Sequence, residues 1–82
     1  GNLFVSDFNQ NIIRMLNRSI NFIPTTIGGN GILGFTPDGN LARNSSLSFP
    51  RNLAIDYQAN SLYFIEGDRI RSIDLNSNIL ST

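Results

Sequence analysis

The 82-residue sequence contains no cysteine, no histidine, no lysine and no tryptophan. Disulfides and thiolate metal sites are therefore excluded, and the chain lacks both the commonest metal ligand and the usual general base. Six arginines balance six acidic residues, so no basic field attracts nucleic acid or anionic lipid. The apolar runs are too short to span a membrane. These absences argue against most enzymes and metal proteins, and we expect no cofactor, no metal site, no nucleic-acid partner and no membrane partner.

Turn-forming residues are abundant, with twelve asparagines, nine serines and seven glycines. Asparagine and glycine tolerate positive φ, and asparagine and serine bond their own backbone, so these residues favour turns. They separate short stretches rich in Ile, Phe, Leu and Val, and no stretch keeps a helical apolar spacing over three turns. The sequence therefore predicts an all-β protein. The expected strands are residues 3–6, 12–16, 21–23, 25–27, 53–56, 62–66, 69–74 and 78–81.

Two expected strands lack the alternation of a strand that has one face in water. Leu3-Phe4-Val5 and residues 62–65 are continuously apolar, which is typical of strands covered on both faces. Residues 69–74 alternate more, and residues 78–81 form a short segment with polar ends. We therefore expect apolar neighbours on both sides of the sheets, and burial that declines from residues 62–65 toward the last strand.

The chain contains an internal repeat, with a two-residue deletion in one turn of the second copy. The aligned segments are 2–7 with 61–66, 11–17 with 68–74, and 21–26 with 78–82. Arg14 and Arg71 occupy one repeat position, and Asp7 and Glu66 end the equivalent strands. We expect each arginine to form a structural ion pair with such an acidic residue; the alternative is a site for a carboxylate or phosphate group.

Two stretches carry a family resemblance. GNLFVSDFNQNIIRML, residues 1–16, resembles the NHL-repeat pattern, in which a GNLYVAD strand turns into an NRIRK strand. GGNGILGFTPDGNLARNSSLSFPRNLAID, residues 28–56, resembles the long inter-blade connection of extended NHL repeats. The chain departs from the family at Pro37, where glycine is usual, and at the shortened turn Gly67-Asp68.

The resemblance implies a β-propeller with blades of four antiparallel strands. Residues 1–27 would supply strands two to four of one blade, residues 28–51 the connection, and residues 52–82 a full blade. Ala54 would suit the innermost strand, where space is tight. These assignments give about one and three-quarter blades, fewer than the four to eight of a closed propeller. We expect a piece of a larger propeller; the alternative is that copies complete the ring between them, with three chains as the first guess.

We expect a non-catalytic scaffold that binds a macromolecule, mainly protein, and also contacts other propeller blades. The candidate binding residues are Phe35, Asp38, Arg43, Asp56 and Tyr57, of which the first three lie in the long segment 28–49. Asp38 lies in a turn signal at residues 36–39, and the ordinary role of Asp56 is also to form a turn.

Other functions stay open at this stage. The alternatives are a metal-dependent lyase whose ligands lie in other blades, a self-assembling propeller fragment, and a spacer between domains. The sequence does not fix the compartment, and the resemblance only leans toward an exported or cell-surface protein.

Overall fold

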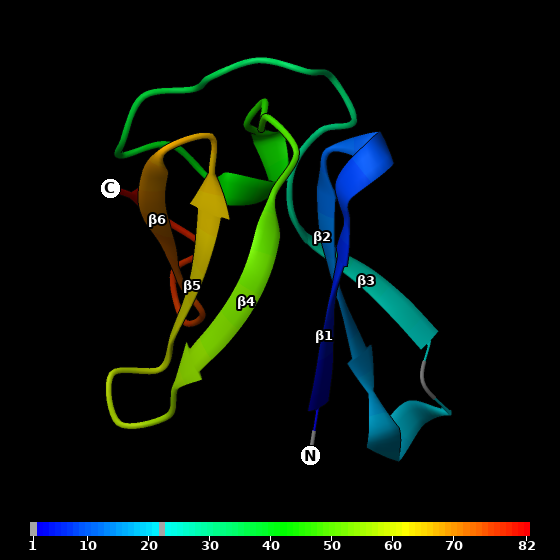
Figure 1. Cartoon of the computed structure of the whole chain (residues 1–82). Coiled ribbons are helices and arrows are strands. Elements are labelled where there is room, and N and C mark those ends of the chain that lie inside the picture. Colours follow the sequence, from blue (N-terminus) through cyan, green and yellow to red (C-terminus); the bar gives the residue numbers. More distant parts are fainter. Residues whose placement is uncertain (1, 22) are drawn as a thin grey trace.

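The computed structural model describes residues 2–21 and 23–82, which form two antiparallel β-sheets (Figure 1). The three-stranded sheet has the order β1-β2-β3, and the four-stranded sheet has the order β4-β5-β6-β7. The strands are β1 (Asn2–Asp7), β2 (Ile12–Asn17), β3 (Ile23–Gly28), β4 (Arg51–Asp56), β5 (Ser61–Glu66), β6 (Arg69–Asp74) and β7 (Leu80–Ser81). Three 3₁₀ helices of three residues each, Phe8–Gln10, Arg18–Ile20 and Ala42–Asn44, are the helical elements of this part of the chain. The all-β prediction is therefore confirmed, while no closed ring of sheets is seen in the described residues.

Two expected strand boundaries were wrong. Residues 21–23 and 25–27 were expected as separate strands, but Ile23–Gly28 is continuous; Pro24 is tolerated because β3 lies at the edge of its sheet. Phe22, which falls in one of these expected strands, lies outside the described residues. The last strand is shorter than expected because Asn78 has a φ of 65° and donates its N–H to the carbonyl oxygen of Asp74, which makes it part of a turn.

Asparagine shapes the hairpins. Five of the six described non-glycine residues with positive φ are Asn11, Asn21, Asn52, Asn60 and Asn78. Four of them lie in the loops that join consecutive strands, and asparagine accepts the left-handed conformation at lower cost than most residues. The spacing of these residues in the sequence therefore sets the strand lengths.

The two sheets share one register. Arg14 pairs with Val5 across β1 and β2, and Arg71 pairs with Phe64 at the equivalent place in β5 and β6. Paired residues in an antiparallel ladder point to the same face. We call the face that carries Arg14 or Arg71 the arginine face of its sheet, and the opposite face the reverse face.

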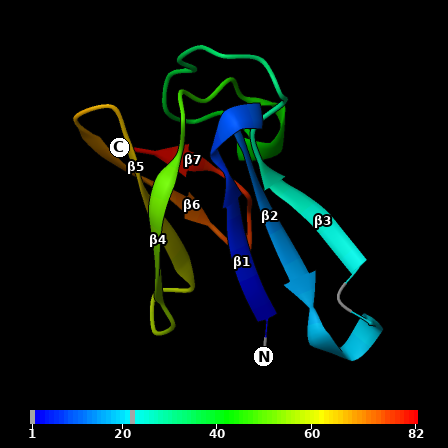
Figure 2. The same cartoon turned by 45° about the vertical axis from the view of Figure 1, so that its right-hand side comes forward.

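The core lies where the arginine face of the four-stranded sheet meets the reverse face of the three-stranded sheet. A Cβ atom built on Gly28 of β3 would lie 2.9 Å from Ile73 Cδ1 and 3.6 Å from Ile13 Cβ, so the two faces approach closely there. The fully buried apolar residues are Ile13, Ala42, Leu47, Leu62, Phe64, Ile73 and Leu80. Ala42 and Leu47 belong to the connection between β3 and β4, which passes over both sheets (Figures 1 and 2).

The connection is ordered by its own contacts. A parallel bridge joins Leu33 to Leu47, and the backbone of Gly39 and Asn40 exchanges hydrogen bonds of 2.8 and 2.9 Å with Leu80. At its end, the Ser6 hydroxyl of β1 donates to the carbonyl oxygen of Pro50. The connection, residues 29–50, therefore packs against both sheets.

The expected burial was wrong in four respects. Tyr63, in a strand expected to be covered on both faces, is exposed because the reverse face of the four-stranded sheet has no cover within the described residues. Leu3 and Val5 are exposed because nothing covers the arginine face of the three-stranded sheet within the described part of the chain. Ala54, expected in a tight space, is also exposed, because it lies on the reverse face of the other sheet. Leu80, expected near solvent in the last strand, is fully buried because the connection covers it.

We predict that Gly29→Ala destabilises the protein more than Gly39→Ala. Both glycines have a φ near 90°, which costs an L-residue about 1–2 kcal/mol. An alanine Cβ at position 29 would also lie 2.1 Å from the carbonyl oxygen of Asn11, whereas the space at position 39 is open. Urea unfolding of both variants measures the difference; equal losses would show that the backbone of Asn11 moves away freely.

Candidate functional site

The four-stranded sheet holds a buried arginine. The side chain of Arg71 is fully buried, and its NH1 lies 3.3 Å from Glu66 Oε1. Its NH2 donates to Asp38 Oδ1 at 3.0 Å and to the carbonyl oxygen of Thr36 at 2.7 Å. The second carboxylate oxygen of Glu66 accepts the N–H of Ser48 at 3.0 Å. The guanidinium thus links the β5–β6 hairpin to the connection, and Glu66 engages the connection a second time.

Arg14 forms the equivalent pair in the other sheet under different conditions. Its NH1 lies 3.7 Å from Asp7 Oδ2, and its side chain is 38% exposed. Both expected ion pairs are therefore formed. The second carboxylate at Arg71, Asp38, comes from the long connection, and sequence reasoning did not assign it to that arginine.

Phe35 is held against the same arginine. Its ring centroid lies 4.5 Å from Cζ of Arg71 and 4.4 Å from Cζ of Arg69, which is the geometry of a cation–π contact. Phe35 is nevertheless half-exposed. The structure therefore brings the candidate residues Phe35 and Asp38 together around Arg71.

Asp38 lies in a turn that spans Pro37 to Asn40, one residue later than expected. Gly39 takes the positive φ of this turn, and Asn40 Nδ2 donates to the carbonyl oxygen of Pro37 at 2.9 Å. The hydroxyl of Thr82 donates to Asp38 Oδ1 at 2.7 Å. This hydrogen bond, and then the one from Arg71, lower the pKa of Asp38 below its ordinary value of 3.8.

The remaining candidates lie elsewhere. Arg43 is exposed in the 3₁₀ helix Ala42–Asn44, and its backbone N–H donates to Asn78 Oδ1 at 3.0 Å. Asp56 closes the β4–β5 turn, because its Oδ1 accepts the N–H groups of Gln58 and Ala59 at 3.0 and 3.2 Å. The structure does not join these residues to the cluster around Arg71.

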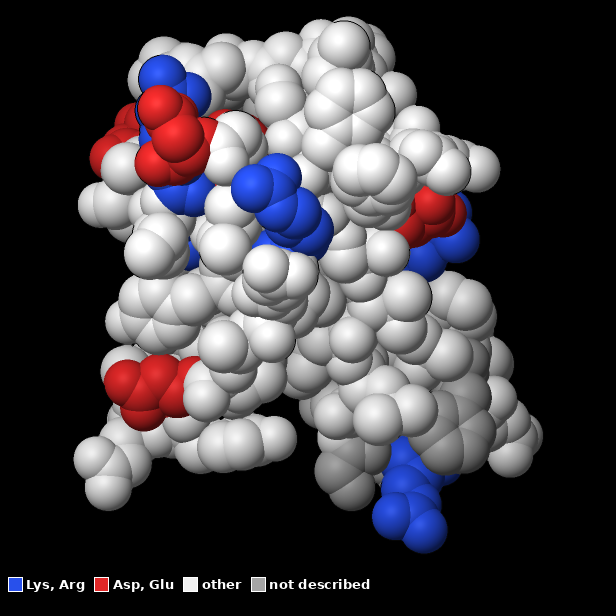
Figure 3. All heavy atoms as spheres, viewed as in Figure 1, with Lys and Arg blue, Asp and Glu red and all other residues white. Residues whose placement is uncertain are grey.

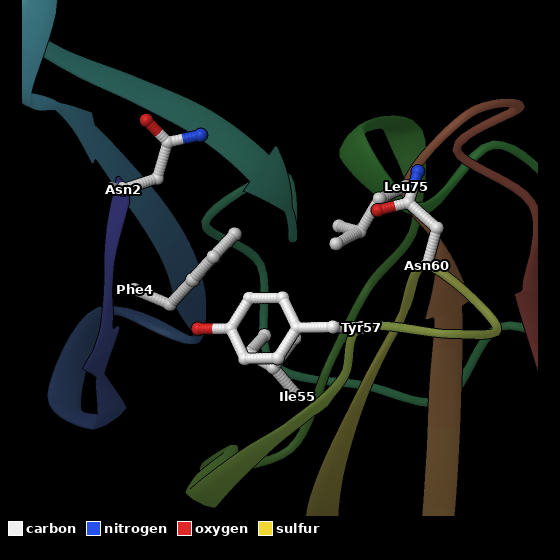
Figure 4. A pocket seen from close by; sticks show the side chains of 6 residues that line it. All are labelled: Asn2, Phe4, Ile55, Tyr57, Asn60 and Leu75. Carbon is white, nitrogen blue, oxygen red and sulfur yellow. The ribbon is translucent and has the colours of Figure 1, made fainter.

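Tyr57 lines a pocket between the two sheets. The pocket has a volume of about 290 Å³ and lies between β1 and the outer end of β4 (Figure 4). Its lining residues are Asn2, Phe4, Ile55, Tyr57, Asn60 and Leu75. Tyr57 is 83% exposed, and its ring reaches from the end of β4 toward the side of Phe4 (Figure 4).

A group of exposed apolar side chains lies on the connection and on the β1–β2 turn. Phe8 and Phe49 stack at a centroid distance of 5.4 Å with their rings tilted by 52°. Two parts of the connection are linked to each other, because the Ser48 hydroxyl donates to the carbonyl oxygen of Gly34 at 2.9 Å. We call the exposed side chains of Phe8, Ile32, Leu33, Phe35 and Phe49 the loop face. In the view of Figure 3, the top centre and upper right are uncharged, whereas acidic and basic side chains gather at the upper left, where the connection also passes.

Phe49 has an unusual backbone conformation. Its φ is 48°, which costs a bulky residue free energy, and its N–H donates to Oδ1 of the buried Asn11 at 2.8 Å. This hydrogen bond holds the backbone of the residue in place while its side chain stays 41% exposed. Sequence reasoning missed Phe8, Ile32 and Leu33; the one available signal was a large apolar residue, Phe8, inside a turn.

The described residues contain no cluster of three or more acidic side chains that could hold a metal ion. In the same residues, no helix is both long enough and apolar enough to cross a bilayer. No protein-family model matches the chain, and a search of curated proteins finds no match either.

We predict that Arg71→Met costs about 3–5 kcal/mol of unfolding free energy, whereas Arg14→Met costs less than about 1 kcal/mol. The substitution is the same and the register positions are equivalent. The first change leaves Glu66 buried without its partner, while the second leaves Asp7 partly in water. Urea unfolding compares the two variants, and similar losses would mean that burial does not govern the strength of these pairs.

The lowered pKa of Asp38 predicts a pH dependence. Since the pKa of this carboxyl is lower in the folded than in the unfolded chain, its stabilisation is complete above pH 3.8 and is lost as the pH falls through the folded value. Asp38→Asn should be less stable at neutral pH and should lose less stability on acidification than the wild-type protein.

Urea unfolding at neutral and at strongly acidic pH measures both effects. Asp74→Asn is the matched control, because hydrogen bonds from the N–H groups of Ser77 and Asn76 also lower the pKa of Asp74, but away from Arg71. In the double variant Arg71→Met/Asp38→Asn the Asp38 effect should shrink, whereas the Asp74 effect should persist in an Arg71→Met background. An Asp38 effect of full size without Arg71 would assign the lowered pKa to Thr82 alone.

Proposed function

We propose that this chain belongs to a β-propeller of the NHL type and acts as a non-catalytic scaffold that binds a protein partner through the loop face. The shared register of the two sheets supports the propeller, since each sheet is the same hairpin unit. The way they stack also supports it, because the arginine face of one packs on the reverse face of the other, as in a repeating array.

The observation that carries the binding proposal is the exposed and strained Phe49. A bulky residue in the left-handed region is unfavourable, and such strain is concentrated at functional positions. An aromatic pair on a backbone fixed by hydrogen bonds can anchor a partner at a small cost in side-chain entropy. The loop face therefore has the aromatic character typical of the centre of a protein interface.

Three of the six carboxylates of the chain favour binding over catalysis. Glu66 and Asp38, which meet at one point, are both bonded to Arg71, and Asp56 accepts the N–H groups of its own turn. An acid or base catalyst needs a proton-accepting group directed at a substrate. These three groups are instead occupied in holding the fold.

We predict that Phe49→Asn weakens partner binding without loss of stability. Asparagine adopts positive φ readily, which recovers about 1–2 kcal/mol, while the lost Phe8–Phe49 contact costs about 0.5–1.5 kcal/mol. The two effects on unfolding free energy should roughly cancel. A protein captured by the tagged wild-type chain is titrated against each purified variant, and its Kd should rise roughly tenfold or more with Phe49→Asn.

Ile23→Asn is the matched control, because Ile23 is similarly exposed but lies on β3, away from the connection. Its Kd should equal that of the wild-type chain, and urea unfolding checks that both variants are folded. If the partner binds the Phe49→Asn variant as tightly as the wild-type chain, the loop face is not the binding surface.

A further inference from the structure

We propose that copies of this chain associate head to tail, with the reverse face of the four-stranded sheet of one copy packed on the arginine face of the three-stranded sheet of the next. This inference rests on the proposed propeller character of the chain and names the surfaces through which it extends. The evidence is the interface between the two sheets, which already pairs these two kinds of face within one copy.

The internal interface supplies the template. The arginine face of the four-stranded sheet contributes Leu62, Phe64 and Ile73, all of them fully or almost fully buried. The reverse face of the three-stranded sheet contributes Ile13, which is fully buried, and Phe4, which packs against the same core. One chain therefore shows that an arginine face and a reverse face of this register fit together.

The arginine face of the three-stranded sheet has the same character but no cover within the described residues. By register, Leu3 is equivalent to Leu62 and Val5 to Phe64. Leu62 is fully buried, whereas Leu3 is 56% exposed and Val5 is also exposed. The pair Arg14–Asp7 carries no net charge, so it does not repel a neutral surface.

The reverse face of the four-stranded sheet is the complementary surface. Ile70 is equivalent to Ile13 and Tyr63 to Phe4. Ile13 is fully buried, yet Ile70 is 65% exposed, and Tyr63 is exposed as well. The side chains that would fill the core of a second interface are thus present on this face.

The difference between these two faces indicates that a second copy of the chain covers them. The two uncovered surfaces differ from each other, and the contact seen within the chain joins unlike faces. A second copy satisfies both surfaces by heterologous contacts, which give rings where the rotation closes and filaments where it does not. The chain carries no net charge, so copies do not repel one another strongly at neutral pH.

Two face-blocking variants test the proposal. Val5→Asp places a charge on the arginine face of the three-stranded sheet, and Ile70→Asp places one on the reverse face of the other sheet. Ile23→Asp is the matched control, because Ile23 is also exposed but pairs with Asn17 on the reverse face of the three-stranded sheet, which is neither of the two contact faces. All three sites are exposed in a single copy, so circular dichroism and urea unfolding should show folded proteins.

Light scattering and native mass spectrometry read the assembly. The wild-type chain and the control should form species larger than one copy, and each face-blocking variant alone should be monomeric. An equimolar mixture of Val5→Asp and Ile70→Asp should form a one-to-one dimer and stop there, because it contains one intact pair of unlike faces.

Three results would overturn the inference: a monomeric wild-type chain, a face-blocking variant that still dimerises alone, or a mixture that stays monomeric. The test is independent of the loop face, since Phe49→Asn should assemble as the wild-type chain does. Partner binding that depends on Phe49 in a monomeric chain would refute the stacking and leave the binding proposal standing. Assembly without binding of a partner through Phe49 would support the stacking and refute the binding proposal.

Discussion

The structure depends on the burial of one cation. A guanidinium removed from water must be bonded by carboxylates or carbonyl groups, or its desolvation is not offset. Glu66 comes from the same hairpin as Arg71, but the other two acceptors, Asp38 and the carbonyl oxygen of Thr36, come from the connection. The connection must therefore fold back over the sheet. Once it does so, its backbone covers Leu80 and its apolar side chains close the core between the sheets.

A comparison of the two arginines distinguishes the effect of an ion pair from the effect of burial. Arg14 and Arg71 have the same register and similar carboxylate partners, yet only Arg71 is enclosed. The difference is the connection, which supplies Phe35 and Asp38 to one sheet, while the described residues supply no equivalent to the other. A surface pair such as Arg14–Asp7 contributes little to stability. The position of the loop face is fixed by the contacts of Phe35 and Asp38 with Arg71. The ion pair that both sheets have in common does not fix it.

The sequence was informative where local chemistry decides the outcome. Asparagine and glycine marked the turns, and the strands between them were located to within a few residues, because tolerance of positive φ is a property of the residue type. Burial was different, since Leu3 and Leu62 have sequence neighbours of similar character and opposite exposure. Exposure depends on what packs against a face, and that partner is distant in sequence. For the same reason the sequence identified Phe35 and Asp38 as candidates but not their shared contact with Arg71, and it gave no sign that Phe49 adopts a positive φ.

Register distinguishes two kinds of exposed apolar residue in this molecule. Leu3 and Ile70 each have an equivalent that is buried in the other sheet, so the fold itself shows what surface covers such a position. Phe8 and Phe49 lie outside the strand ladders, and no register relation supplies a cover for them. Exposure of the first kind is explained by a repeated contact that one copy alone does not complete. Exposure of the second kind, with the added backbone strain at Phe49, calls for a partner outside the array, and for this reason we assign assembly and recognition to different surfaces.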